Sequence, residues 1–135
     1  MQGLHELATD FTAMLAAGHK QAAADKYWSP DIAIVEPADR QDGSPVTAIG
    51  FPAAQQKLAQ WLGHNTIEDV LIDGPFVTGD RFALFIDMEI VRGDTGRREP
   101  FSEIAMYTVR NGKIVEERHF YDRSDGEFRS KGGVA

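Results

Sequence analysis

Side chains able to move protons are concentrated in three apolar segments of the second half of the chain, where they recur at spacings of two or four residues. They are Asp87 and Glu89, Glu103 and Tyr107, and Glu117, His119 and Tyr121. Because successive side chains of a β-strand point to opposite faces, each set would share one face of its own strand. Carboxylates and a histidine, whose ordinary pKa is about 6.5, are the usual general acids and bases. The spacing therefore predicts acid–base chemistry if these faces line a pocket.

One more carboxylate, Glu36, ends a short apolar segment directly before Pro37. A carboxylate in this place can face water, as most acidic side chains do, or project into a site. The facing of the later strands is equally open, because the polar sets could point to solvent, opposite the apolar set from Leu84 to Ile90. Alternation alone does not decide between the two arrangements.

Signatures of other chemistries are missing from the sequence. The chain contains no glycine-rich phosphate loop, no G-x-S-x-G nucleophile motif and no H-E-x-x-H zinc motif. It has no cysteine, which excludes disulfides, thiolate metal sites and cysteine nucleophiles. We therefore expect neither a metal ion nor a cofactor.

Length and charge narrow the class of protein. The 135 residues suit one domain, which we place over residues 1–135 with a loose tail at 123–135. The net charge of −7, from 21 acidic and 14 basic residues, disfavours binding to nucleic acid or to anionic lipid. No apolar run approaches the roughly 20 residues of a membrane helix, and the N-terminus lacks the pattern of a signal peptide. We expect a soluble, cytoplasmic protein.

The elements that would position these residues follow the order of helices first and strands second. Helical periodicity covers residues 4–17, residues 19–28 and a segment after Pro52. Strand patterns cover residues 32–36, 66–73, 81–92, 101–110 and 113–121. Residues 37–50 are expected to form a long polar loop, and Asn111-Gly112 a tight hairpin turn. Segregated helices and antiparallel strands predict an α+β fold.

Three short motifs lie in this framework: Ala16-Ala17-Gly18, Val35-Glu36-Pro37, and the closing segment YTVRNGKIVEERHFYD, which is residues 107–122. With the order of elements, they make the chain resemble the nuclear-transport-factor-two-like superfamily, and within it the SnoaL-like proteins, over residues 4–122. This superfamily includes ketosteroid isomerases and polyketide cyclases. The resemblance implies a cone-shaped α+β barrel, in which three N-terminal helices pack on a strongly bent, mostly antiparallel sheet and enclose a pocket.

The resemblance also implies which way the strands face. The expected polar lining of the pocket consists of Glu36, Asp87, Glu89, Glu103, Tyr107, Glu117, His119 and Tyr121. The expected apolar lining consists of Phe11, Leu15, Trp28, Leu62 and Phe85. The alternate residues of the same strands would form an apolar outer face, consisting of Leu84, Ile86, Met88, Ile90, Ile104, Met106 and Phe120. Such a face normally marks an interface, so we expect a homodimer centred on Leu84, Ile86 and Phe120.

Only some of the catalytic residues of enzymes in this superfamily have matching residues in this chain. Glu36 matches the position of the ketosteroid isomerase base, but the two oxyanion donors of that enzyme fall on Phe11 and Ala105. Because one such donor is typically worth about 10²–10³ in rate, steroid isomerisation by that route is not expected. Of the three catalytic positions of limonene epoxide hydrolase, only one, an aspartate, has a matching residue in this chain, Asp87. SnoaL-type cyclases use a pocket base near the last strand, which corresponds to His119.

We therefore expect one of two functions. In the first, the chain is a cofactor-free isomerase, cyclase or hydrolase, in which His119 is the base, Asp87 fixes its tautomer and Glu36 is a second acid or base. Tyr107 and Tyr121 would donate hydrogen bonds to a ligand oxygen. In the second, the chain is a ligand-binding or dimerisation module without turnover. Neighbouring carboxylates should raise the pKa of His119, with Asp87 within hydrogen-bond reach of its ring.

Overall fold

The computed structural model describes residues 3–38 and 45–121 of the chain. Within these ranges lie three helices, α1 Leu4–Ala16, α2 Lys20–Tyr27 and α3 Phe51–His64. The strands are β1 Trp28–Ala38, β2 Pro45–Ile49, β3 Asn65–Thr78, β4 Arg81–Arg92, β5 Arg98–Arg110 and β6 Lys113–Phe120. None of these helices is long and apolar enough to cross a membrane.

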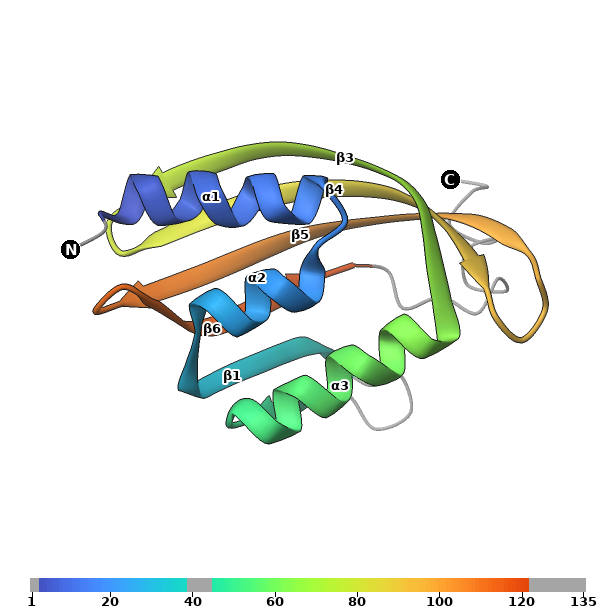
Figure 1. The fold of residues 1–135 in the computed structure, drawn as a ribbon, viewed down its shortest axis with the longest axis horizontal. Coiled ribbons are helices and arrows are strands. Elements are labelled where there is room, and N and C mark those ends of the chain that lie inside the picture. The colour runs from blue at the N-terminus through green and yellow to red at the C-terminus, as the bar shows by residue number, and fades with distance from the viewer. Residues whose placement is uncertain (1–2, 39–44, 122–135) are drawn as a thin grey trace.

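The described strands form one sheet in the order β2-β1-β6-β5-β4-β3. Neighbouring strands are antiparallel except β1 and β6, which are parallel. The helices lie along one side of the curved sheet, with α1 against β3 and α3 against β1 (Figure 1). This is the α+β cone that the resemblance implied. It has a concave face covered by helices and an outer face that the described helices leave uncovered.

An apolar stripe holds α1 on the sheet. The stripe consists of Leu7, Ala8, Phe11 and Leu15, which are all buried. The Phe11 ring meets the rings of Phe82 and Tyr107 edge to face, with centroids 6.0 and 5.0 Å away. These contacts make the concave face beneath α1 a packed core, so any site must lie elsewhere on that face.

Two predicted elements differ in extent. β1 begins at Trp28 and continues through Pro37 to Ala38, whereas the sequence pattern predicted only residues 32–36. Residues 45–49 of the predicted loop form β2, which pairs antiparallel with β1, so the connection is shorter than expected. Residues 39–44 and the predicted loose tail at 123–135 lie outside the described residues.

β3 runs through Gly74 and Pro75, the pair that the sequence pattern suggested as its end. The pairing with β4 shifts register between Asp73 and Phe76, so the pair lies in a bulge within a longer strand. Gly74 has a φ of 123°, and a Cβ atom there would lie 2.9 Å from the carbonyl oxygen of Ala83. Because only glycine fits this close approach, it bends the strand here and does not end it.

The facing predicted for β4 is wrong. Its buried residues are Phe82, Leu84, Ile86, Met88 and Ile90. The alternate residues Phe85, Asp87 and Glu89 point to the outer face. The cause is the register with β5, in which Ile86 lies directly opposite the inward-facing Glu103. Since opposite residues of an antiparallel pair share a face, the facing of β5 fixes the facing of β4.

The same correction changes the outer face. Leu84 and Ile86 belong to the core and cannot centre an interface, but Ile104 and Phe120 lie on the outer face as expected. Phe85 joins them as a direct cross-strand neighbour of Ile104, which in turn neighbours Phe120. The three side chains are 38%, 47% and 51% exposed, so the outer face carries an apolar row across β4, β5 and β6.

Candidate active site

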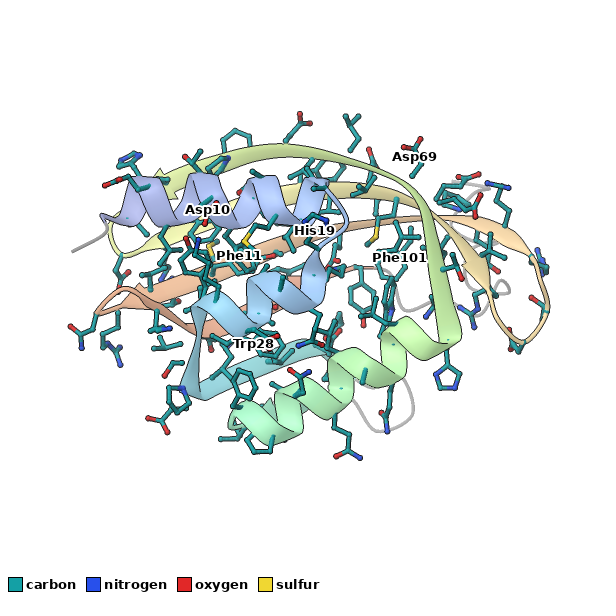
Figure 2. All side chains as sticks on the ribbon, in the orientation of Figure 1. Asp10, Phe11, His19, Trp28, Asp69 and Phe101 are labelled. Carbon is teal, nitrogen blue, oxygen red and sulfur yellow. The ribbon has the colours of Figure 1, made fainter. Side chains whose placement is uncertain are left out.

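A cavity of about 350 Å³ lies between the concave face of the sheet and α3. Its sheet side consists of Ile34, Glu36, Met88, Phe101, Glu103, Glu117, His119 and Tyr121. Its remaining lining consists of Lys20, Trp28, Ala54, Lys57, Leu58, Gln60, Trp61, His64 and Asn65. Figure 2 shows Trp28 and Phe101 near different halves of α3. The volume lies toward the lower end of the range of about 300–1,000 Å³ for ligand pockets.

Three adjacent strands bring the acid–base residues of this cavity together. β1 and β6 run parallel with Ile34 beside Glu117, so the next inward pair along this register is Glu36 and His119. β5 lies on the other side of β6, where Ala105 is opposite His119 and Glu103 is the next inward residue. The side chains of Glu36, His119 and Glu103 therefore meet on one part of the concave face.

The imidazole of His119 bridges two carboxylates. Nδ1 lies 2.7 Å from Oε1 of Glu103, and Nε2 lies 3.1 Å from Oε1 of Glu117. The two carboxylate side chains are 7% and 9% exposed, and the imidazole is 14% exposed. An imidazolium that donates from both ring nitrogens satisfies this geometry. We refer to Glu103, His119 and Glu117 as the histidine trio.

The electrostatics of the trio keep the imidazole charged. Burial is the largest single influence and disfavours imidazolium, but the hydrogen bonds and charges of Glu103 and Glu117 outweigh it and raise the pKa of His119 to about 10. Burial would also raise the pKa of Glu103, but the hydrogen bond and charge of His119, with the charge of Lys20, hold that pKa below its ordinary value. The predicted rise for His119 is confirmed. Its predicted partner is wrong, because Glu103 and Glu117 stand where Asp87 was expected.

Two further hydrogen bonds tie the cavity wall together. Nε1 of Trp28 donates to Oε2 of Glu117 at 2.5 Å, so both oxygens of that carboxylate have protein partners. The Tyr121 hydroxyl donates to Oε1 of Glu36, also at 2.5 Å. Glu36 is half-buried, and within residues 3–38 and 45–121 its Oε2 has no hydrogen-bond partner. One oxygen of Glu36 is therefore oriented by the protein, and the other is available to a ligand.

A smaller cavity of about 40 Å³ lies beside the first, between α1 and the sheet. Phe11, Leu15 and Tyr107 line this space and do not reach the larger cavity. Burial, followed by the charges of Glu117 and Glu103, raises the pKa of the Tyr107 hydroxyl well above its ordinary value, so the hydroxyl stays neutral. A space of this size holds about one to three water molecules. Phe11, Leu15 and Tyr107 therefore pack behind the site and do not contact a ligand in the larger cavity.

Three predicted lining residues lie on the outer face, away from both cavities. They are Phe85, Asp87 and Glu89, which follow the reversed facing of β4. On that face, the Ser102 hydroxyl donates a hydrogen bond to Asp87, as expected for direct cross-strand neighbours. Asp87 therefore has a structural partner far from His119 and cannot fix its tautomer.

The helical part of the lining also differs from the prediction. Leu62 is 37% exposed and does not line the cavity, whereas Leu58 and Trp61 do. Lys57, Leu58 and Trp61 lie three, four and seven residues after the buried Ala54, which is the spacing of one helix face. That spacing was the available signal for Lys57. No sequence pattern marked Lys20, Gln60, His64 or Phe101 as lining residues.

The site offers proton transfer and hydrogen bonding by its own side chains. Within the described ranges, no three histidine, aspartate or glutamate side chains are grouped as they would be around a metal ion. The carboxylates of the cavity bond to His119, Trp28 and Tyr121.

Comparisons with known proteins extend this description. A family model for the SnoaL-like domain matches residues 3–121. No curated protein matches the chain. Among solved structures, a protein from Mesorhizobium loti, provisionally named a SnoaL-like polyketide cyclase, is 36% identical. The alignment covers 89% of this chain and 100% of that one, with a TM-score of 0.81.

Two more distant structures share the fold. One, from Bacillus subtilis and provisionally named an isomerase, is 15% identical with a TM-score of 0.73, and 90% of each chain is covered. The other, TerC co-crystallised with polyporic acid, is 18% identical with a TM-score of 0.68, covering 94% of this chain and 95% of its own. At these identities both show the fold alone. The family match over residues 3–121, together with the 36% identical structure, shows that the chain belongs to the SnoaL-like domain family.

Proposed function

We propose that the chain is a cofactor-free enzyme that moves a proton on a small organic molecule bound in the larger cavity, with Glu36 as the base. The observation that carries this proposal is the oriented Glu36 carboxylate, held by Tyr121 at 2.5 Å beside the histidine trio. Isomerisation and cyclisation both begin with such a proton transfer. The family match agrees with a small-molecule substrate.

His119, the base expected from the sequence, is a poor base in this geometry. With a pKa of about 10 it is already protonated at neutral pH, and a base must be deprotonated to act. Both ring nitrogens also have carboxylate partners, so a ligand would have to displace Glu103 or Glu117 to reach one. We therefore assign His119 the role of holding Glu103 and Glu117 in place, and we move the base to Glu36.

The step can be written with the residues of this chain alone. Oε2 of Glu36 takes a proton from a carbon next to a carbonyl group. The electron pair of the broken C–H bond forms a C=C bond to the carbonyl carbon, and the π pair of the C=O bond moves to the oxygen. The resulting enolate carries the negative charge that Glu36 loses when it takes the proton, so the total charge beside the histidine trio does not change during the step. In a substrate with a further C=C bond conjugated to the enolate, returning the proton to the far carbon of that bond shifts the double bond, completes an isomerisation and restores Glu36.

Hydrogen–deuterium exchange at a ketone tests this step directly. We expect the wild-type protein in D₂O to accelerate exchange of the C–H protons of pentane-2,4-dione or 4-acetylbenzamide, measured by proton NMR. Glu36→Gln should lower that rate by about 10²-fold or more, the usual worth of a general base. Glu89→Gln removes the same charge from the outer face and should leave the rate unchanged. Equal rates for wild type and Glu36→Gln would overturn the assignment.

A ligand-binding module without turnover is the second candidate. The observation in its favour is that the histidine trio is saturated by its own hydrogen bonds, with Trp28 completing it. A ketone that raises the melting temperature of the protein, but exchanges no faster than in buffer, would support this candidate against the enzyme.

We also infer that the chain forms a homodimer through the outer face of its sheet. Support comes from the apolar row of Phe85, Ile104 and Phe120. Leu71 and Phe76 on β3 extend the apolar surface and are 68% and 60% exposed. An exposed apolar surface of this kind usually binds another protein, and a two-fold copy of the same face is the commonest partner.

A further inference from the structure

We propose that the ligand of the larger cavity is an aromatic carboxylic acid of one or two rings, with a keto or hydroxyl group at the end opposite its carboxylate. This inference rests on the proposed function for the placement of the reacting group. It adds the class of molecule and the residues that select it, Lys20 and Lys57.

The acidic and basic side chains of the cavity come from different elements. Its sheet side carries the carboxylates of Glu36, Glu103 and Glu117, while the helices contribute Lys20 and Lys57. Both lysines are half-buried, and within the described part of the chain neither forms an ion pair. The charge of Lys20 acts on Glu103 without an ion pair, and Lys57 has no acidic partner among the described residues. They provide a place for a carboxylate that enters with the ligand.

A row of aromatic rings connects Lys20 to Glu36. The ammonium of Lys20 lies 5.7 Å from the ring centroid of Trp61, and Trp61 meets Phe101 edge to face at 6.1 Å. Phe101 in turn lies 5.1 Å from the ring of Tyr121, the residue that holds Glu36. Such a row favours a flat aromatic body, because ring pairs gain from offset or edge contacts. The row of rings leads from the Lys20 ammonium to the Glu36 carboxylate.

Near Glu36, at the other end of these aromatic rings, the ligand must carry a different group. Oε2 of Glu36 accepts hydrogen bonds or a proton, so it suits a hydroxyl group or an acidic C–H next to a ketone. A second carboxylate on the ligand would be repelled there by Glu36 and the two carboxylates of the trio. The ligand therefore has one anionic end and one neutral end.

The cavity volume limits the size of the ring system. A cavity of about 150 Å³ lined by apolar side chains holds benzene. The cavity here is about 350 Å³, a little more than twice that, so one substituted ring or two fused rings fit with their polar groups.

Binding of matched ligands tests the proposal on the full-length protein. 4-Acetylbenzoate carries a carboxylate and, at the other end of one ring, a methyl ketone; 4-acetylbenzamide has the same shape without the charge. We expect calorimetry to show the acid binding about tenfold or more tighter than the amide, which corresponds to one charge-assisted contact. Lys57→Gln and Lys20→Gln should each remove most of that difference and leave the affinity for the amide unchanged.

Arg110→Gln is the matched control, because it removes one positive charge at the exposed end of β5, away from the cavity lining. Lys20 also contacts Trp61, so Lys57→Gln keeps the test valid if Lys20→Gln unfolds. Equal affinity for acid and amide, an unchanged acid affinity in Lys57→Gln, or no binding of either compound would overturn the ligand class. Exchange of the ketone protons, lost in Glu36→Gln, reports on the proposed function separately.

Discussion

The histidine trio allows the charged imidazolium of His119 to be buried. An imidazolium that is 14% exposed would lose several kcal/mol of hydration if it stood alone. Two carboxylates at 2.7 and 3.1 Å supply the opposing charge, and Trp28 holds the second of them in place. His119 was visible in the sequence as a strand histidine among acids. Its partners were not, because a contact between neighbouring strands depends on their register.

The sign of each pKa shift predicts how stability depends on pH. The folded-state pKa of His119, about 10, lies above the ordinary value of 6.5, so its stabilising contribution is complete below about pH 6.5 and is lost as pH rises toward 10. Glu103 has a lowered pKa, so its contribution is present above 4.5 and is lost on acidification. We expect urea unfolding to show a free energy highest near pH 5–6.5 and lower by a few kcal/mol near pH 9.

The matched variants separate His119 from other titrating groups. His119→Gln should lose about 3–5 kcal/mol at pH 6, because two buried carboxylates then lack their cation, and its alkaline slope should disappear. His64→Gln changes an exposed histidine at the end of α3 and should keep the wild-type slope. A wild-type profile that is flat from pH 6.5 to 9 would contradict the raised pKa.

Titration of the His119 ring by proton NMR identifies its partners directly. Glu103→Gln should lower the pKa of His119 more than Glu117→Gln does, because the Glu103 contact is shorter, 2.7 against 3.1 Å. Asp87→Asn removes a carboxylate from the opposite face of the sheet and should leave that pKa unchanged. A clear fall in Asp87→Asn would restore the facing first expected from the sequence.

At the scale of elements, periodicity predicted the type and order of the helices and of most strands, but not the facing of β4. β5 and β6 turn polar residues such as Glu103 and His119 inward, whereas β4 turns apolar residues such as Ile86 inward. The two halves of the concave face differ because α1 covers a packed apolar core and α3 covers the larger cavity. The facing that the resemblance implied, with the polar residues of all three strands turned inward, is therefore wrong for β4. Cross-strand register decides the facing, and a single sequence does not reveal it.

Two neighbouring residues of β4 test this facing. Ile86→Ala should lower the free energy of unfolding by about 2–5 kcal/mol, because it opens a cavity in the core. Asp87→Ala, one position along the strand, should cost about 1 kcal/mol, the worth of its hydrogen bond with Ser102. Urea unfolding measures both. Similar losses for the two variants, or a larger loss for Asp87→Ala, would reverse the assignment.

At the scale of the whole molecule, the closing motif from Tyr107 onward predicted the fold, and the assembled site needed the structure. β6 and β5 follow directly from that motif and its hairpin turn. The lysine end of the cavity instead joins the start of α2 to the cavity side of α3, and only their docking on the sheet brings Lys20 and Lys57 into one lining. The ends of cavities are half-exposed by nature, so hydrophobic periodicity does not mark them.

The last prediction concerns assembly through the outer face of the sheet. Phe85, Ile104 and Phe120 form one cross-strand row, and an exposed apolar row across three strands favours burial against a second copy. We expect light scattering at micromolar concentration to give a dimer, and Ile104→Glu to give a monomer, because each copy would then place an unpaired carboxylate in the apolar interface. Leu62→Glu adds the same charge on α3 and should remain a dimer. A monomeric wild type, or a dimeric Ile104→Glu, would show that this face is not the interface.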